Sequence, residues 1–181
     1  TTDGRSLLSE GYTKVDAFIL QVMDELKTLG IAENTLLVAM ADNGPMIHHP
    51  PPGLGMAEVM FTGGKGDNTE GGVRVPAFAW WPGTIKPNSF VGDIIHVTDL
   101  FTTFARIGEG TKNIPTDRVI DGIDQTSLLL NGDAFSRRDY VHIYKGQELA
   151  ATVKGVYKID WTRAIPGMVS DNYFDLQNDI R

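Results

Sequence analysis

The residues of this sequence best suited to chemistry are an acid beside an amide and, in a later loop, a lysine between glycines. Asp42 and Asn43 carry the hard oxygen donors that Ca²⁺ and Mg²⁺ prefer in proteins. Lys65 lies in a Gly-Gly-Lys-Gly segment, where the backbone can approach a ligand and an ammonium can hold an oxyanion. Taken alone, Asp-Asn-Gly is also an ordinary turn, and Lys65 an ordinary solvated residue. A nucleotide P-loop is excluded, because Val59 and Gly66 stand where that motif needs Gly and Ser or Thr.

A buried strand is expected to position the acid and the amide. Residues 35–41 are almost continuously apolar, as in a strand covered on both faces within a parallel sheet. An amphipathic helix is predicted over residues 11–30, with Ser9 as its N-cap and Gly30 as its left-handed terminator. Ligands of open α/β sheets bind at the carboxyl ends of the strands, which is where Asp42 falls.

The segment that follows reads as a functional loop. Residues 46–72 are rich in Gly and Pro and show little periodicity, and structureless segments of this length are uncommon unless they are functional. Glu70 and Arg74 flank two glycines, which predicts an internal ion pair that fixes the loop. A second buried strand is predicted over residues 73–81.

The remaining elements predict the fold class and its division. Thr98 or Asp99 can begin a helix that extends to about Ile107. Short antiparallel strands are then expected over residues 140–144, 150–154 and 157–161. The chain is therefore predicted to be α/β, with part of a mixed, mostly parallel sheet flanked by helices and a small C-terminal antiparallel sheet. The expected domains are residues 1–115 and 116–181.

Composition limits the partners. The 181 residues carry a formal charge of −7 and no cysteine. An acidic chain offers no broad electrostatic footprint for nucleic acid. No apolar run approaches the length of a membrane span, and the first residues lack the order of a signal peptide. Neither a nucleic-acid nor a membrane partner is expected.

Taken together, the motifs resemble a known family. The sequence is similar to the C-terminal part of the type I sulfatases of the alkaline-phosphatase superfamily, from about residue 11 to residue 179. The motifs that carry the resemblance are Asp42-Asn43-Gly44, Gly64-Lys65-Gly66, Glu70-Gly71-Gly72-Val73-Arg74-Val75-Pro76 and Trp81-Pro82-Gly83. The resemblance implies an incomplete sulfatase fold and a sulfuric ester hydrolase.

The resemblance also implies roles for individual residues. Asp42 and Asn43 would supply half the ligands of a divalent cation, Ca²⁺ or Mg²⁺, together with two aspartates from an N-terminal part. Lys65 would act as a catalytic residue and contact the sulfate. The nucleophile of the family is a hydrated formylglycine, with cation and lysines neutralising the sulfate oxygens as the ester oxygen leaves.

The sequence departs from the family at the nucleophile. Formylglycine arises from Cys or Ser in a Cys/Ser-x-Pro-x-Arg signature, but this chain has no Cys, and no Ser is followed two positions later by Pro. The N-terminal aspartate pair is missing as well. We therefore expect a fragment of a sulfatase that has negligible activity alone, with the formylglycine on residues outside it.

The histidines separate into one pair and two single residues. His48 and His49 precede three prolines in the long loop and are candidate substrate contacts. His96 is predicted to be a hydrogen-bonded packing residue, and His142 to mark the polar face of its strand.

The sequence is compatible with more than one substrate class and with a non-catalytic role. The expected substrate is a sulfate ester small molecule or a sulfated glycan, and a phosphate or phosphonate ester of the same superfamily is the alternative. A non-catalytic module that pairs with a separate N-terminal half is a second alternative. Self-association or such pairing is expected through the exposed sheet, since an unpaired edge and an apolar face favour contacts. Family resemblance suggests a periplasmic, secreted or lysosomal location.

Overall fold

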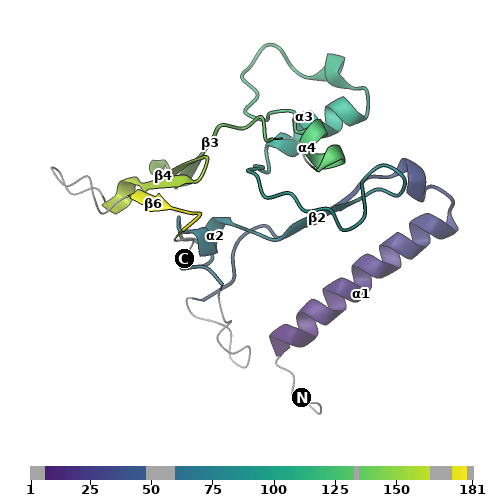
Figure 1. The fold of residues 1–181 in the computed structure, drawn as a ribbon, viewed down its shortest axis with the longest axis horizontal. Helices are drawn as coiled ribbons and strands as arrows, with labels where there is room; N and C mark the ends of the chain where they lie inside the picture. Colours follow the sequence, from purple (N-terminus) through teal and green to yellow (C-terminus); the bar gives the residue numbers. More distant parts are fainter. Residues whose placement is uncertain (1–6, 48–59, 133–134, 164–172, 179–181) are drawn as a thin grey trace. The chain divides into compact units, whose positions relative to one another are not determined.

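The computed structural model describes residues 7–47, 60–132, 135–163 and 173–178 (Figure 1). The chain divides into two compact units, Thr1–Pro82 with Asn178–Arg181, and Gly83–Gln177. Within the described ranges, no helix has both the length and the apolar character needed to cross a membrane. The expected domains of residues 1–115 and 116–181 stay a prediction.

The first unit begins with helix α1 (Leu7–Thr28), whose end follows from its sequence. Gly30 takes a φ of 68°, the left-handed conformation that glycine adopts without strain. Its N–H donates to the Lys27 carbonyl at 3.0 Å, and the N–H of Ile31 donates to the Leu26 carbonyl at 3.1 Å. These two bonds form a Schellman motif, so the predicted terminator is confirmed.

The start of α1 corrects the prediction. Ser9 lies inside the helix rather than at its N-cap, because the helix already includes Leu7. Leu7 and Leu8 stand two turns before Val15 in the sequence and extend the same apolar spacing. The helical pattern therefore began earlier than the capping signal suggested.

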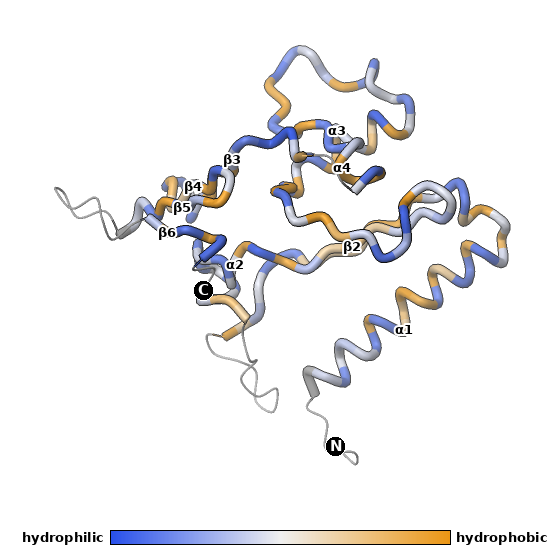
Figure 2. The backbone as a smooth tube through the Cα atoms, in the orientation of Figure 1, coloured by the Kyte–Doolittle hydropathy of each residue, from blue (hydrophilic) through white to orange (hydrophobic). Residues whose placement is uncertain are grey.

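One side of α1 presents apolar residues to solvent. Figure 2 shows hydrophobic and hydrophilic residues alternating along this helix, as in an amphipathic helix. Tyr12, Val15 and Phe18 nevertheless remain 64%, 56% and 64% exposed. These three side chains therefore form an exposed apolar stripe on the helix.

Strands β1 (Leu37–Met40) and β2 (Ala77–Trp80) form the sheet of this unit. They pair antiparallel, with Leu37 opposite Trp80. The α/β class is confirmed, but this pairing differs from the parallel one expected for these strands. A continuous apolar run indicates that both faces of a strand suit burial, and it carries no information on the direction of the neighbouring strand.

The second strand also begins later than predicted. Residues 70–73 form a single helical turn, α2 (Glu70–Val73), and the N–H of Arg74 donates to the Glu70 carbonyl at 2.8 Å. Residue 73 therefore belongs to the turn, and β2 starts at Ala77, after Pro76. A 3₁₀ turn, η1 (Ala32–Asn34), precedes β1, and the Trp81 indole donates to the Glu33 carbonyl at 2.7 Å.

The second unit contains two short helices and an antiparallel sheet. Helix α3 (Asp99–Ile107) begins where predicted, with Thr98 in the N-cap position but without a side-chain capping bond. The small C-terminal antiparallel sheet is confirmed, with strand order β3-β4-β5-β6. The remaining elements are η2 (Thr111–Asn113), α4 (Thr126–Asn131), β3 (Tyr140–Lys145), β4 (Glu148–Lys154), β5 (Tyr157–Asp160), η3 (Trp161–Arg163) and β6 (Tyr173–Asp175).

A buried ion pair organises the second unit. Asp99 is fully buried, and its carboxylate accepts hydrogen bonds from the Ile123 N–H at 2.8 Å, the His96 N–H at 2.9 Å and the Arg138 Nε at 2.8 Å. Burial would raise the pKa of Asp99, but the hydrogen bond from Arg138, aided by the two backbone donors, holds it below the ordinary value. One carboxylate thereby joins the start of α3 to the loop before α4 and the segment before β3.

Candidate functional site

Asp42 and Asn43 lie where the chain leaves the two-stranded sheet. The Ala41 N–H donates to the Pro76 carbonyl at 3.1 Å, which extends the pairing one residue beyond β1. Asp42 is then exposed and Asn43 half-buried. The Asn43 amide nitrogen donates to the Gly44 carbonyl at 2.8 Å, so the amide oxygen remains as an acceptor or ligand.

A set of backbone hydrogen bonds connects this loop to the loop that carries the lysine. The Gly44 N–H donates to the Gly72 carbonyl at 3.0 Å, and the Lys65 N–H donates to the Pro45 carbonyl at 2.8 Å. The Gly71 N–H donates to the Thr62 carbonyl at 2.8 Å. The backbone of Lys65 is therefore bonded to Pro45, which lies three residues after Asp42 in the sequence.

Four glycines make this attachment sterically feasible, and we call them the glycine cluster: Gly44, Gly64, Gly71 and Gly72. A Cβ on Gly44 would lie 1.7 Å from the Gly71 oxygen, and one on Gly64 would lie 2.3 Å from the Pro45 oxygen. Cβ atoms on Gly71 and Gly72 would lie 2.1 and 2.2 Å from backbone oxygens of the lysine loop. No side chain fits at these positions, so the two loops pack backbone against backbone.

Sequence reasoning missed the role of these glycines. In the sequence, Gly71 and Gly72 stand between the acid and the arginine of the predicted ion pair, and that pair explains their position without any contact to another loop. Their adjacency in Glu70-Gly71-Gly72 was the available signal, because consecutive glycines often mark a close approach of another backbone.

The predicted ion pair between Glu70 and Arg74 is confirmed. The Arg74 Nε lies 3.9 Å from the Glu70 carboxylate, whose side chain is 8% exposed. The Arg74 guanidinium also lies over the Phe61 ring, 5.6 Å from its centroid, within the range of a cation–π contact. The ion pair spans α2 itself, and the contact with Phe61 links the end of α2 to the segment before Lys65.

The side-chain oxygens of Asp42 and Asn43 are donors of the type that a hard cation binds. One carboxylate and one amide oxygen are the donor types that Ca²⁺ and Mg²⁺ take. Among the residues that the structure describes, no group of three or more His, Cys, Asp or Glu side chains is arranged to hold a metal ion. Since Ca²⁺ takes roughly 6–8 oxygen ligands, Asp42 and Asn43 would supply only part of a cage. Their role and that of Lys65 stay predictions.

Of the four histidines, the structure describes His96 and His142. His48 and His49 lie outside the described residues, so their predicted substrate contacts stay a prediction. His96 is half-buried, and its Nδ1 lies 2.8 Å from the Thr98 hydroxyl, as expected of a hydrogen-bonded packing residue. Burial, followed by the nearby charge of Arg138, lowers the pKa of His96. His142 is exposed on β3, with its Nδ1 3.0 Å from the Thr152 hydroxyl, which confirms that it marks the outward face.

The comparison with protein families assigns this chain to one class. Residues 7–110, which contain the acid–amide pair, the glycine cluster and the lysine, match the family model described as Sulfatase. The chain therefore belongs to the sulfatase family, and the resemblance seen in the sequence is confirmed.

Individual relatives support the assignment. The chain is 35% identical over 162 residues to N-acetylgalactosamine-6-sulfatase of Mus musculus, which covers 89% of this chain and 30% of that protein. It is 36% identical over 141 residues to steryl-sulfatase of Rattus norvegicus, with 76% and 24% covered. It also resembles the crystal structure of the PsFucS1 sulfatase from Pseudoalteromonas sp., with a TM-score of 0.79, 31% identity, and 92% and 36% of the two chains covered. The chain thus spans about a third or less of the length of these relatives.

Proposed function

We propose that this chain is a portion of a sulfuric ester hydrolase that supplies half of a divalent-metal site and a sulfate-binding lysine. The supporting observation is the hydrogen bond from the Lys65 N–H to the Pro45 carbonyl within the glycine cluster. It holds an ammonium-bearing loop against the loop that carries Asp42 and Asn43. Anion binding and cation binding would then occur on adjoining loops, as ester hydrolysis requires.

Asp42 and Asn43 would hold the cation with ligands from other parts of the whole protein, and Ca²⁺ fits these donors, with Mg²⁺ as the second choice. The bound cation would supply positive charge to the sulfate oxygens. The Lys65 ammonium would bind a sulfate oxygen and stabilise the negative charge that develops as the ester bond breaks. The nucleophile, a formylglycine in this family, must come from outside these 181 residues, because they contain neither Cys nor a Ser in the required signature. The chain alone is expected to be inactive.

The proposed substrates are sulfate esters, either small molecules or sulfated glycans. Relatives named for N-acetylgalactosamine-6-sulfate and steryl sulfate chemistry favour this class. His48 and His49 are proposed substrate contacts in the long loop. A periplasmic, secreted or lysosomal location suits such substrates. The exposed apolar stripe of α1 supports self-association or contact with the remaining part of the sulfatase fold.

The test uses the full-length protein that carries this segment. Hydrolysis of an aryl sulfate and of an aryl phosphate is measured for the parent protein, for Lys65→Ala and for Lys86→Ala, an exposed lysine outside the candidate site. We expect sulfate hydrolysis that Lys65→Ala reduces by about 10²-fold or more and that Lys86→Ala leaves unchanged. Preference for the phosphate would indicate the alternative substrate class. Full activity in Lys65→Ala would contradict the proposed role of the lysine.

A further inference from the structure

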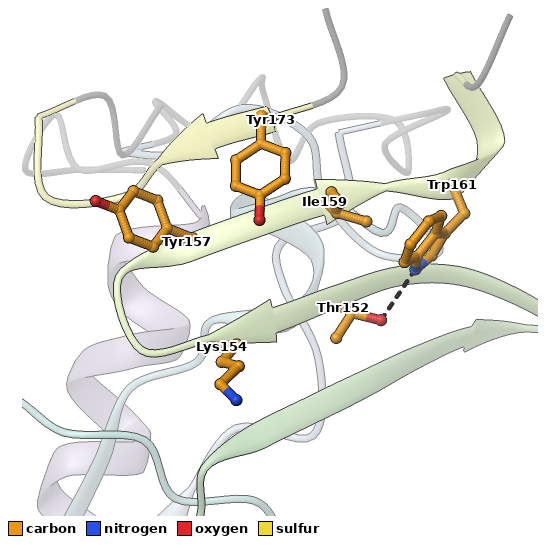
Figure 3. A pocket seen from close by; sticks show the side chains of 6 residues that line it. All are labelled: Thr152, Lys154, Tyr157, Ile159, Trp161 and Tyr173. Atoms are coloured by element: carbon orange, nitrogen blue, oxygen red, sulfur yellow. Dashed lines mark hydrogen bonds between the residues drawn. The ribbon is translucent and has the colours of Figure 1, made fainter. Parts of the chain in front are cut away.

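A hollow and a carboxylate lie outside the proposed mechanism. The hollow, about 80 Å³ on the C-terminal sheet, is crossed by a hydrogen bond of 2.9 Å from the Trp161 indole to the Thr152 hydroxyl (Figure 3). Its volume is small beside the roughly 300–1,000 Å³ of pockets that enclose drug-sized ligands. The carboxylate is Asp67, which is half-buried and follows Lys65 by two residues. Its contacts act directly on the loop that carries the lysine.

Lys65 occupies the second position of a tight turn. The Asp67 N–H donates to the Gly64 carbonyl at 2.9 Å, which closes a β-turn of four residues. Gly66, at the third position, has a φ of 91°, and Lys65 keeps a negative φ, as in a type II turn. Glycine is the residue that adopts this third position without strain, so Gly66 specifies the turn.

The Asp67 side chain closes the same turn a second time. Its carboxylate accepts a hydrogen bond from the Gly64 N–H at 3.0 Å, so Asp67 binds both polar groups of the Gly64 backbone. The Lys65 N–H in turn donates to the Pro45 carbonyl at 2.8 Å. Hydrogen bonds therefore fix both peptide planes that precede the Lys65 Cα. They set the direction in which the lysine side chain leaves the backbone.

The carboxylate of Asp67 is confined where it lies. A Cβ on Gly63 would lie 3.0 Å from Oδ2 of Asp67 and 2.0 Å from the Thr69 hydroxyl oxygen, so both side chains pack against the Gly63 backbone. A glycine at position 63 thus leaves the room through which the carboxylate reaches the Gly64 N–H. Alanine at position 67 would remove this acceptor and release one of the two closures of the turn.

We propose that Asp67 is a positioning residue for Lys65. By accepting the Gly64 N–H, its carboxylate holds the turn from which the lysine extends, and thereby fixes the point from which the ammonium reaches the substrate. The inference rests on the proposed function, in which Lys65 binds a sulfate oxygen. A donor that is aligned in advance needs no reorganisation in the transition state, and a displacement of about 1 Å can cost roughly 10²-fold in rate. The acceptor oxygen of Asp67 matters here, and its negative charge does not.

The experiment measures kcat and KM for aryl sulfate hydrolysis by the full-length protein that carries this segment. Asparagine at position 67 keeps a side-chain oxygen that can accept the Gly64 N–H, whereas alanine does not. We expect Asp67→Ala to lower kcat about tenfold with a change in KM of less than about threefold, and Asp67→Asn to retain about half of kcat or more. In the Lys65→Ala background, Asp67→Ala should lower the residual rate less than about twofold, because the lysine that it positions is gone.

The matched control is Asp175→Ala. The Asp175 carboxylate also accepts a hydrogen bond from a nearby backbone N–H, that of Gln177 at 3.0 Å, and it lies outside the lysine loop. Its loss should leave kcat and KM near the parent values. Hydrogen exchange of the peptide that contains Gly64, followed by mass spectrometry, should accelerate in Asp67→Ala and stay near the parent rate in Asp67→Asn.

The outcomes separate this role from the proposed function. A parent protein that hydrolyses neither aryl sulfate nor aryl phosphate would refute the proposed function, and the role of Asp67 with it. An active parent that Asp67→Ala matches in kcat would refute the positioning role alone. Equal losses from Asp67→Ala with and without Lys65 would indicate a general structural role, and a loss in Asp67→Asn as large as in Asp67→Ala would indicate that charge acts instead; either result overturns the proposal.

A second variant covers the case in which Asp67→Ala fails to fold. A Cβ on Gly66 meets no atom within 4 Å, so Gly66→Ala strains the positive φ of the same turn without a clash. It should lower kcat in the parent and have little effect in the Lys65→Ala background. Unchanged kcat in Gly66→Ala would show that the geometry of this turn does not control the lysine.

Discussion

Replacement of Arg138 by methionine should strongly destabilise the second unit. The guanidinium is the largest stabilising partner of the fully buried Asp99 carboxylate, and methionine keeps much of its aliphatic volume without the charge. Loss of one member of a buried pair costs about 3–5 kcal/mol. Asp99 would keep its hydrogen bonds from Ile123 and His96, which places the expected loss near the lower end, about 3 kcal/mol.

Two measurements test this loss. Urea denaturation followed by circular dichroism reports the free energy of unfolding, and amide hydrogen exchange reports the Ile123 N–H that donates to Asp99. A loss of about 3 kcal/mol should accelerate exchange of that amide by roughly 10²-fold. Arg138→Met combined with Asp99→Asn should recover part of the stability, because no charge then remains buried.

The matched control is Arg118→Met. Arg118 makes a similar bidentate pair with Asp117, but both side chains are largely exposed, at 66% and 69%. Solvent screens such a pair, so no measurable loss is expected. If Arg138→Met leaves both the denaturation midpoint and the protection of Ile123 unchanged, the buried pair does not organise this unit.

The same pair predicts a pH dependence with a definite sign. The pKa of Asp99 is lowered in the folded protein from its ordinary value of 3.8. Its contribution to stability is therefore fully present above the unfolded pKa and is lost as the pH falls through the lower, folded pKa. The acid-induced loss of stability should be smaller in Arg138→Met, which acid denaturation at constant urea concentration would measure.

Three further changes have expected outcomes. Gly71→Ala should destabilise the first unit by about 1–3 kcal/mol in urea denaturation, because the new methyl would lie 2.1 Å from a backbone oxygen. The control is Gly11→Ala on the open surface of α1, which should leave the stability unchanged or increase it. Gly30→Ala should cost about 1–2 kcal/mol and shift the thermal transition of α1 downward, since its φ is 68°; an unshifted transition would argue against the C-terminal motif. Burial and the charge of Arg138 lower the pKa of His96, so in Arg138→Met this histidine should titrate at a higher pH, as measured by NMR. The contribution of neutral His96 to stability is fully present above pH 6.5 and is lost as the pH falls through the folded pKa, and this loss should be smaller in Arg138→Met.

Local signals in the sequence predicted local structure well. The end of α1 was predicted because a left-handed glycine acts through its own backbone and its immediate neighbours. The start of α3 at Asp99 and the short C-terminal strands were predicted for the same reason, and the turns between these strands contain Gly146 and Gly155, which take positive φ angles. The helix start near Ser9 was wrong because a capping residue is only a preference, and apolar residues before it extended the helix.

Properties that depend on distant contacts were harder to predict. The direction of pairing between β1 and β2 is set by how the chain returns from the long loop, and an apolar run does not encode it. Residue types made Asp42, Asn43 and Lys65 candidates, and the resemblance to the sulfatases implied their roles. That the backbone of Lys65 lies against Pro45 depends on glycines whose importance is visible only when two loops are in contact.

The glycine cluster has a consequence for how this protein tolerates change. Because the two loops meet mainly through main-chain atoms, with the Ile47 side chain beside Gly64, the spacing between them depends little on the identity of the other side chains nearby. Exposed positions around Lys65 can accordingly be exchanged while the Lys65 backbone stays bonded to Pro45. The same arrangement makes the four glycine positions intolerant of every other amino acid, so diversification in laboratory libraries should spare them and vary the rest.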